Sequence, residues 1–376
     1  MLVIPYFDPR PKRRCIDLYN RREELHKLIE YMSSSPLILL LGLRRTGKTS
    51  LLYTAINESK IPCIVFDLRE IPGDGIITMD IFLKFFSDKI NLFLEKNRRI
   101  AERFLEVVKH IEEISIVGLK IKIKSMRRGR LNIIELFRAL NDATESIGMN
   151  IVLAFDEAQE LRRIARYRFT RILAYIYDFF DNISILLTGS QIGLLYNFLK
   201  ISDPESPLYG RAYDKIYLKN FTPEMSKEFL IQGYKQYGID PPEELIEYAV
   251  SKLNGVVGWL TLLGYRSVRN RIFDKKVVDE VLDIASRIAF NEFKHFLALR
   301  WQARDRYISI MRNLAIKELT WSQLKRSVEL DLNQRIYDKN FTNLIKSLID
   351  GGFISKNSEK YYFIVDPALK RYFETK

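Results

Sequence analysis

Residues Gly42-Leu43-Arg44-Arg45-Thr46-Gly47-Lys48-Thr49 match the spacing G-x-x-x-x-G-K-[ST] and stand between an apolar run and a helix-like stretch. The two glycines let the backbone curl so that successive N–H groups point at phosphate oxygens, and the following helix adds the positive end of its dipole. Lys48 then supplies charge to the β- and γ-phosphates, and the Thr49 hydroxyl binds Mg²⁺. The pattern predicts a nucleoside triphosphate site that includes Ser50, the alternative being an ordinary glycine-rich turn.

A second strand pattern, Ile151 to Phe155, ends in the carboxylates Asp156 and Glu157. Five consecutive apolar residues are typical of a parallel strand buried on both faces, so Asp156 should lie at the edge of the sheet where ligands bind. There Asp156 is expected to hold Mg²⁺ through water, and Glu157 to orient and polarise an attacking water. The alternative is that both acids only begin a surface helix, where a first turn favours them.

A third apolar strand, Ile183 to Leu187, leads into Thr188-Gly189-Ser190-Gln191, and Gly210-Arg211 precedes the strand-like residues 215–218. Thr188 or Ser190 could read the γ-phosphate or hold the water, although Ser190 is also a plausible N-cap for the next helix. Arg211 could act as an arginine finger, either in cis or from a neighbouring subunit. A lone surface arginine is the alternative, because the chain is rich in arginine.

Two further segments flank these features, Tyr19 to Leu25 before the first strand and Asn254 to Leu260 after the fifth. In this order the chain resembles the AAA+ branch of P-loop ATPases, and more narrowly the archaeal ATPase family that borders the signal-transducing STAND NTPases. The first segment resembles the family's "gRe.EL" box, which implies that the N-terminal segment with Arg21 folds over the adenine. Arg44 and Arg45 match the family's basic pair.

The second segment resembles the family motif G-x-P-G-W-L at the start of a lid helix. Val257 stands where the family has a proline, and no arginine occupies the first lid-helix turn after Gly258, so no sensor-2 residue is assigned. The resemblance implies ATP or ADP with Mg²⁺ as cofactors, a five-stranded parallel sheet, a helical lid and a C-terminal winged helix. It also favours ATP over GTP, and no N-K-x-D guanine-reading motif is evident.

The strand candidates alternate with long helix-patterned stretches, which is the signature of an α/β doubly wound parallel sheet. The candidates are Pro36–Leu41, Ile61–Leu68, Asn150–Asp156, Ile183–Thr188 and Asp214–Leu218. A chain of 376 residues is expected to hold two or three domains. We place an ATPase core at 1–219, a helical lid at 220–302 and a winged helix at 303–376.

Composition predicts an intracellular, cytoplasmic protein without a membrane segment. Hydrophobic residues make up 47% of the chain, but no run approaches the 18 apolar residues of a membrane span. The apolar N-terminal stretch is too short for a signal peptide and is followed by Asp8 and Pro9. The two cysteines, Cys15 and Cys63, provide neither a disulfide framework nor a metal-ligand spacing.

The net charge of +13 raises the possibility of a nucleic acid partner, because each lysine or arginine that neutralises a phosphate releases a counterion. Lys120, Lys122 and Lys124 alternate with apolar residues, which predicts one basic face of a strand or hairpin inserted before the acidic strand. That face could contact DNA. It could equally be an edge strand that its lysines protect against aggregation.

The C-terminal segment has the order of a winged helix: helices at Trp321 to Val328 and Asn333 to Asp350, then strands at Phe353 to Lys356 and Tyr361 to Val365. The predicted buried stripe of the second helix consists of Ile336, Tyr337, Phe341, Leu344, Ile345 and Leu348. Its outer face carries Arg335, Lys339, Asn343 and Lys346, which could enter a DNA groove or remain a solvated face.

These features together predict a Mg²⁺-dependent ATPase of AAA+/STAND type whose nucleotide state sets the positions of the lid and the winged helix, possibly on DNA. One alternative is a slow or non-hydrolysing switch that serves as a DNA-binding or signalling scaffold for a protein client. Another is a small-molecule P-loop kinase, which two C-terminal domains in place of a short lid disfavour. The oligomeric state stays open.

Overall fold

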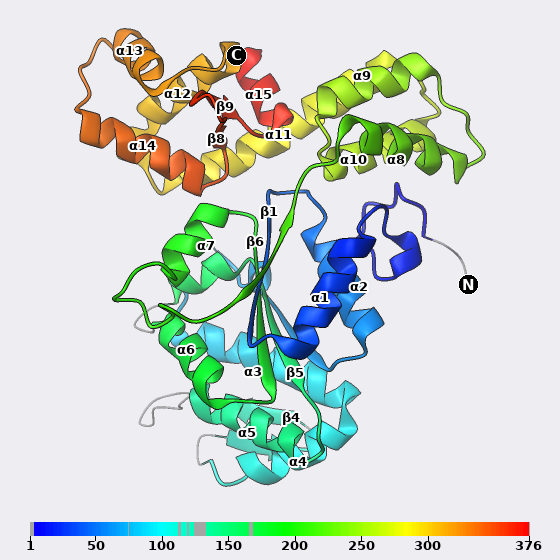
Figure 1. Cartoon of the computed structure of the whole chain (residues 1–376), viewed down its shortest axis with the longest axis vertical. Coiled ribbons are helices and arrows are strands. Elements are labelled where there is room, and N and C mark those ends of the chain that lie inside the picture. The colour runs from blue at the N-terminus through cyan, green and yellow to red at the C-terminus, as the bar shows by residue number, and fades with distance from the viewer. Residues whose placement is uncertain are drawn as a thin grey trace.

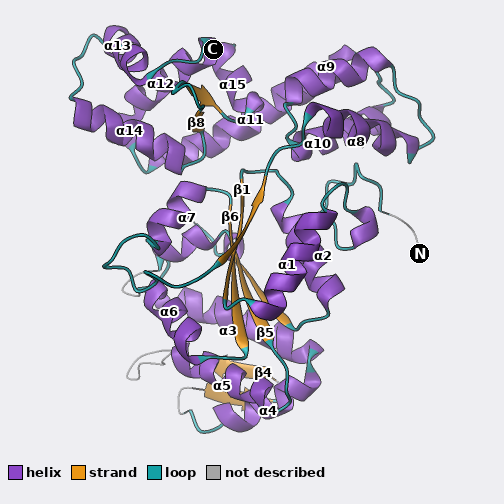
Figure 2. Cartoon of the chain, viewed as in Figure 1, coloured by secondary structure: helices purple, strands orange, loops and turns teal. Residues whose placement is uncertain are grey.

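The computed structural model describes residues 4–73, 75–111, 114–118, 120–123, 133–164 and 168–375. An α/β part contains the N-terminal half of the chain, and two groups of helices lie above it in Figure 1. Figure 2 shows that the long strands all belong to the α/β part, whereas the C-terminal part is mainly helical. Within the described ranges, no helix is both long and apolar enough to cross a membrane.

Five parallel strands form the central sheet. They are β1 (Leu37–Gly42), β2 (Cys63–Asp67), β5 (Ile151–Asp156), β6 (Ile183–Gly189) and β7 (Asp214–Leu218). Their order across the sheet is β2-β5-β6-β1-β7, and every neighbouring pair is parallel. The predicted five-stranded parallel sheet is confirmed, with strand ends displaced by two residues at most. Because β6 lies between β1 and β5, its end separates the phosphate loop from the acidic residues.

Helices cover both faces of the sheet. Ile38 and Leu40 of β1 pack with α1 (Arg22–Ser34) and α2 (Lys48–Ser59). The alternate β1 residues, including Leu39, belong to the larger core on the opposite face. The helices of that side are α3 (Met79–Lys96), α4 (Arg98–Val108), α5 (Ile133–Glu145), α6 (Phe169–Phe179) and α7 (Ile192–Leu199). The continuous apolar runs of the strands are therefore explained by burial on two sides.

A two-stranded antiparallel hairpin is inserted before β5, as the alternation of lysines predicts. It consists of β3 (Ile114–Val117) and β4 (Lys120–Ile123). Asn91 of α3 holds it, because its side chain both donates to the Ile121 carbonyl at 2.9 Å and accepts from the Ile121 N–H at 2.8 Å. Ile121 is buried, whereas Lys120 and Lys122 are exposed. The third lysine of the predicted face, Lys124, lies outside the described residues.

The first group of C-terminal helices follows β7. It contains α8 (Pro223–Lys235), α9 (Glu243–Leu253), α10 (Val257–Asn270) and α11 (Lys275–Ala298). The second group has the predicted winged-helix order. It contains α12 (Arg304–Ile316), α13 (Trp321–Asp331), α14 (Asp338–Asp350), the antiparallel strands β8 (Ile354–Lys356) and β9 (Tyr362–Ile364), and α15 (Pro367–Glu374). Short 3-10 helices lie at η1 (Cys15–Asp17), η2 (Leu68–Glu70), η3 (Ala158–Arg163) and η4 (Trp301–Ala303).

Helix α11 connects the two groups, and one hydrophobic cluster runs through both of them. The ring of Phe293 on α11 lies 5.1 Å from the ring of Phe353 and 5.7 Å from that of Phe373 on α15. Phe353 precedes β8, so α11 packs against the winged helix along its C-terminal half. The boundary that we place after residue 302 therefore follows a helix shared by both groups, and the domain limits remain a prediction.

The predicted start of the longer winged-helix helix is wrong. We expected a helix from Asn333, but α14 begins at Asp338. Asn333 adopts a left-handed conformation (φ +47°), which ends the turn after α13. Tyr337 precedes the helix in an extended conformation and is 80% exposed, so it does not belong to the buried stripe. Ile336 is buried as expected, because its N–H donates to Glu329 at 2.7 Å and holds the connecting segment against α13.

Candidate functional site

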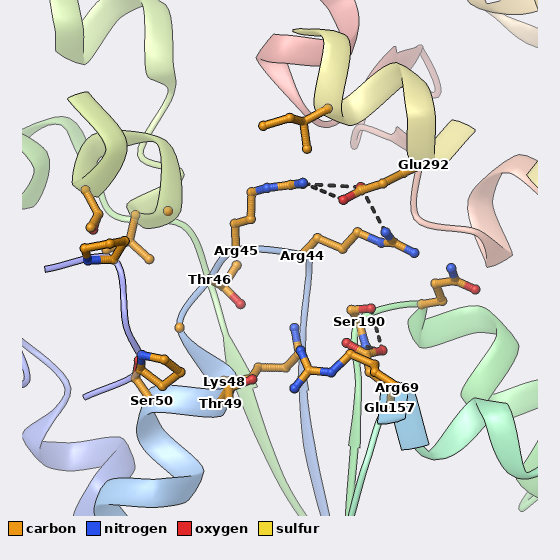
Figure 3. Close-up of a pocket in the computed structure, with 18 of the residues that line it drawn as sticks. Arg44, Arg45, Thr46, Lys48, Thr49, Ser50, Arg69, Glu157, Ser190 and Glu292 are labelled. Atoms are coloured by element: carbon orange, nitrogen blue, oxygen red, sulfur yellow. Dashed lines mark hydrogen bonds and ion pairs between the residues drawn. The ribbon is translucent and has the colours of Figure 1, made fainter. Parts of the chain in front are cut away.

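The phosphate loop joins the buried end of β1 to the first turn of α2 (Figure 3). A Cβ on Gly42 would lie 2.8 Å from both the Leu218 carbonyl oxygen and the Thr46 hydroxyl, so a larger residue does not fit. Gly47 has φ +94°, a conformation that side-chain-bearing residues rarely adopt. The loop therefore turns back on itself, and the first turn of α2 lines a cleft with backbone N–H groups that have no partner within the helix.

Lys48 points back across the loop that precedes it. Its ammonium donates to the carbonyl oxygens of Gly42 at 2.8 Å and Leu43 at 2.7 Å. Burial lowers the pKa of Lys48 to about 8, although the charges of Glu157 and Asp156 oppose the shift. The ammonium is thus a buried cation between the loop and the acid pair, where it can neutralise a phosphate group.

The cleft above the loop has a volume of about 990 Å³. Of the residues predicted to bind cofactor or act in catalysis, the cleft is lined by Arg21, Arg44, Arg45, Thr46, Gly47, Lys48, Thr49, Ser50, Glu157 and Ser190. Gly42, Leu43, Asp156 and Thr188 do not line the cleft, but they lie at or next to the ends of β1, β5 and β6. The structure therefore gathers the predicted loop, acid and hydroxyl residues at one edge of the sheet.

Asp156 ends β5 and is buried. One carboxylate oxygen, Oδ1, accepts a short hydrogen bond from the Thr188 hydroxyl. The other, Oδ2, accepts from Arg69 at 2.8 Å and more weakly from the Thr49 hydroxyl at 3.4 Å. Burial raises the pKa of Asp156, and the hydrogen bond from Thr188 and the charge of Arg69 oppose the rise. Its position beside Thr49 is that of the predicted pair of metal ligands.

Glu157 adopts a left-handed conformation (φ +56°) at the point where β5 passes into η3. This conformation is costly for a residue other than glycine, and it persists only where neighbours hold it. Oε2 of Glu157 accepts from the Ser190 hydroxyl and from Gln159, both at 2.6 Å, and from the Ser190 N–H at 3.2 Å. Burial alone would raise the pKa of Glu157, but Lys48, Ser190 and Gln159 outweigh it and leave the pKa lowered.

Thr188 and Ser190 act as supports for the two acids. The Thr188 oxygen also accepts from the Glu157 N–H at 3.1 Å, so this one side chain contacts both acidic residues. Ser190 does not cap α7, because the residue before that helix is Gln191 and no side chain caps it. The cap interpretation of Ser190 is therefore wrong, and its hydroxyl is committed to Glu157.

The segment before α1 lines one side of the cleft, and its expected position over an adenine stays a prediction. The Lys12 N–H donates to the Ser50 hydroxyl at 3.1 Å, which ties this segment to the start of α2. Tyr19 packs edge-on against Phe221, with ring centroids 5.5 Å apart. Arg21 lies over the same Phe221 ring at 4.9 Å and donates to the Lys219 carbonyl oxygen at 2.6 Å.

Arg211 is not part of this cleft. It precedes β7, whose first residue Asp214 pairs with Ile38 near the start of β1. In a parallel sheet that edge is opposite to the one where the phosphate loop lies. Arg211 instead forms an ion pair with Asp178 of α6 at 2.5 Å, and it also donates to the Pro207 carbonyl oxygen. The structure does not bring Arg211 to the site in cis, and delivery from a neighbouring subunit stays a prediction.

Three residues of the site are absent from the sequence prediction. Gln159 holds Glu157, and Arg69 pairs with Asp156. Glu292 of α11 pairs with the phosphate-loop arginines (Figure 3). Arg69 follows the end of β2 in the sequence. A polar residue at that end of a parallel strand is a signal from which its place in the site could be predicted. Glu292 lies within a long helix, where a single acidic residue cannot be distinguished by sequence from an ordinary solvent-exposed one.

Residues 18–263 match the family model of an ATPase domain predominantly from Archaea. Residues 301–365 match the C-terminal winged helix-turn-helix domain of MCM proteins. No curated protein matches the chain.

Among solved structures, the Walker-type ATPase PABY2304 of Pyrococcus abyssi is 33% identical, with a TM-score of 0.82, over 98% of this chain and 99% of that chain. The ORC2 protein of Aeropyrum pernix, solved as ADPNP-ADP complexes, is 13% identical with a TM-score of 0.59 over 98% of this chain and 95% of that chain. The second likeness shows the fold alone.

The position of Lys48 generates the first prediction. Because no other ammonium lies between the described loop and the acid pair, Lys48→Ala should weaken Mg·ATP binding at least a hundredfold while the fold remains intact. Isothermal titration calorimetry measures the affinity, and circular dichroism checks the fold. Lys27→Ala, an exposed lysine on α1, is the matched control and should bind as the wild type does. Equal affinity in the Lys48 and Lys27 variants would contradict the prediction.

Proposed function

Because the chain belongs to the family of ATPase domains found predominantly in Archaea, we propose that it binds Mg·ATP and hydrolyses it. The observation that carries the proposal is the position of Glu157, held by Ser190 and Gln159 in the same cleft as Lys48. A site that only bound nucleotide would have no need of a buried, ionised carboxylate beside the phosphate loop.

In this proposal Lys48 contacts the β- and γ-phosphates, and the backbone N–H groups of the loop surround them. Thr49 and Asp156 hold Mg²⁺, and their hydroxyl and carboxylate oxygens are the hard ligands that this ion prefers. The metal supplies charge that stabilises the phosphates during transfer. Thr188 keeps Asp156 oriented by donating to its second oxygen.

Glu157 takes the role of orienting and deprotonating the attacking water. Its lowered pKa keeps it ionised at neutral pH, and its hydrogen bonds all fall on Oε2. Oε1 makes no hydrogen bond within the described part of the chain, so it remains able to accept a proton from water. Ser190 and Gln159 thus fix the carboxylate without occupying both of its oxygens.

The second prediction separates this ATPase from a slow switch. Glu157→Gln keeps the size of the side chain but removes the base, so turnover should fall by about a hundredfold or more with little change in ATP affinity. Phosphate release and nucleotide titration measure the two quantities. Glu160→Gln, on the same 3-10 helix, is the matched control. Measurable turnover that is unchanged in the variant would point to another base. Undetectable turnover in the wild type would support a nucleotide-loaded scaffold.

We also propose that the nucleotide state sets the positions of the lid and the winged helix. Both phosphate-loop arginines pair with Glu292 of α11, Arg44 at 2.9 Å and Arg45 at 2.5 Å (Figure 3). Arg45 also lies over the ring of Trp259 on α10 at 4.1 Å and 3.7 Å from Asp366, the residue before α15. Asp366 in turn accepts from the Trp259 indole at 3.0 Å.

These contacts join the phosphate loop to the lid and the winged helix at one point. Phosphate oxygens that enter the loop compete with Glu292 for the same guanidinium groups, because arginine binds carboxylate and phosphate with the same planar fork. Nucleotide then stabilises arrangements in which the Glu292 contacts are weakened. With this coupling we propose the limits 1–219, 220–302 and 303–376 for the ATPase core, lid and winged helix.

The third prediction tests this coupling. Glu292→Gln removes the charge that both arginines share, so the nucleotide-free variant should show faster hydrogen–deuterium exchange in the C-terminal half of α11. The change in exchange rate of this segment on addition of ATP should then be at most half of the change in the wild type. Glu280→Gln, an exposed acid on the same helix, should behave as the wild type. Identical exchange in all three proteins would show that Glu292 carries no coupling.

DNA binding is the second candidate function, and the exposed face of α14 favours it. Lys339, Asn343 and Lys346 are exposed on this helix of a winged-helix domain. Arg335, which we expected on the same face, is exposed in the segment before the helix begins at Asp338. Lys120 and Lys122 of the hairpin are exposed as well, and Lys120 pairs with Glu95 at 2.9 Å. An exposed ion pair of this kind is weak and would be exchanged for a phosphate contact at little cost.

The fourth prediction follows from counterion release. If the basic groups contact phosphates, the logarithm of DNA affinity should fall with the logarithm of salt concentration, with a slope near −0.9 per contact. Replacing Lys120, Lys122 and Lys124 by Gln should flatten the slope by about two to three units for every sequence. Replacing Arg335 and Asn343 should instead change the preference among sequences.

Fluorescence anisotropy across a salt series, with and without ATP, measures both effects. Replacement of Lys27, Lys235 and Lys276, three exposed lysines on other helices, is the control for net charge. Undetectable binding at about 50 mM salt under every nucleotide condition would remove DNA as a partner and leave a protein client.

A further inference from the structure

Arg69 is the cation nearest to the acid pair that the roles above do not use. It lies in η2, directly after β2, whose last residue Asp67 pairs in register with Asp156 of β5. The Arg69 guanidinium donates to Asp67 through Nε at 2.8 Å and through Nη2 at 2.7 Å. This two-point contact fixes the plane of the guanidinium at the end of the sheet.

The same Nη2 atom reaches the acid pair. It donates to Oδ2 of Asp156 at 2.8 Å, the oxygen that the Thr49 hydroxyl also approaches at 3.4 Å. Arg69 therefore stands beside both residues that we propose as metal ligands. Its guanidinium points toward Lys48 and Thr49 in Figure 3.

One edge of the guanidinium remains available. Nε and Nη2 donate to Asp67 and Asp156, and no described residue accepts a hydrogen bond from Nη1. The side chain is 50% exposed and lines the cleft, although it is anchored on two carboxylates. The contacts that join β2 to β5 use only Nε and Nη2, so they do not account for the exposure of the Nη1 edge in the cleft.

Three other arginines that line the cleft have acidic partners away from Asp156 in this nucleotide-free structure. Arg44 and Arg45 pair with Glu292, and Arg163 pairs with Glu160 at 3.0 Å. Arg211 lies at the opposite edge of the sheet. Within the described chain, Arg69 is thus the arginine held directly against Asp156 with donors directed into the cleft.

We propose that Arg69 is a phosphate-binding residue of the nucleotide site, which donates from Nη1 to the terminal phosphate of ATP while Asp67 and Asp156 hold its plane. The inference rests on the proposed ATP binding and extends it. Lys48 contacts the β-phosphate, which ADP retains, as well as the γ-phosphate, whereas a residue beside the metal ligands contacts the phosphate that ADP lacks. Arg69 therefore makes the site prefer ATP to ADP.

Calorimetric titration of the full chain with Mg·ADPNP and Mg·ADP tests the inference without relying on turnover. Arg69→Ala should weaken Mg·ADPNP binding by about tenfold to a hundredfold, the range for a hydrogen bond to a charged group, and change Mg·ADP binding by less than about twofold. Arg162 is an exposed arginine in the lining of the same cleft, so Arg162→Ala removes the same charge. This control should change neither the Mg·ADPNP affinity nor the Mg·ADP affinity.

Arg69→Lys is the second variant, because it retains the positive charge where loss of the whole side chain could disturb the fold. Lysine lacks the planar fork, so its Mg·ADPNP affinity should lie between those of wild type and Arg69→Ala, with an unchanged melting temperature. Equal weakening of Mg·ADPNP and Mg·ADP in both variants would show that Arg69 only positions Asp156, and would overturn the inference.

A titration with Mg²⁺ at a fixed ADPNP concentration distinguishes phosphate binding by Arg69 from competition between Arg69 and the metal. If Arg69→Ala needs less Mg²⁺ for half-saturation and binds ADPNP no more weakly, Arg69 competes with the metal for Asp156, and the inference is again overturned. Failure of the wild type to bind either nucleotide would instead overturn the proposed ATP function, and this inference with it.

Discussion

Two adjacent carboxylates, Asp156 and Glu157, lose most of their water at the end of one buried strand, and the cleft is organised around compensating their charge. An unpaired ion in such a place costs several kcal/mol, so each acid must have partners of its own. Asp156 receives the Thr188 hydroxyl and Arg69, and Glu157 receives Ser190, Gln159 and the field of Lys48. Different side chains donate to the two carboxylates, and the pKa values move in opposite directions: that of Asp156 rises and that of Glu157 falls. Neighbouring groups that differ in this way are suited to different chemical roles.

The strand order supplies these partners, and the order is the part of the fold that local sequence does not encode. The phosphate loop, the acidic strand and the five strand positions all follow from residue type and spacing, because glycine conformation and burial on two faces act locally. Which strands are neighbours depends on pairings between distant segments. Once β6 lies between β1 and β5, Thr188 and Ser190 must stand between loop and acids, and neither can serve the following helix. The same topology places Arg211 at the opposite edge.

Residues that act through a long-range partner escaped the sequence prediction for the same reason. Arg69 and Glu292 are single charged residues without a motif, and only the pairing of β2 with β5 and the packing of α11 over the loop give them partners. The error at Tyr337 has a different origin. The apolar spacing from Ile336 continues the helical period of α14, but the left-handed Asn333 and the hydrogen bond from Ile336 to Glu329 hold that segment outside the helix. A local backbone conformation here overrides hydrophobic periodicity.

The contacts between the phosphate loop and the C-terminal helices meet at one arginine, Arg45, and at one long helix, α11. Helix α11 has 24 residues, about 36 Å at 1.5 Å per residue, and Glu292 lies in its C-terminal half near the aromatic contacts with the winged helix. Arg45 contacts Glu292, Trp259 and Asp366 together, so lid and winged helix are not held by independent bonds that could be released one at a time. A guanidinium can satisfy a carboxylate or a phosphate at the same fork, but not both fully. A ligand that draws Arg44 and Arg45 away from Glu292 therefore acts on both helical groups at once. The free energy available for this change is limited to the difference between the arginines' affinity for the ligand and their affinity for Glu292.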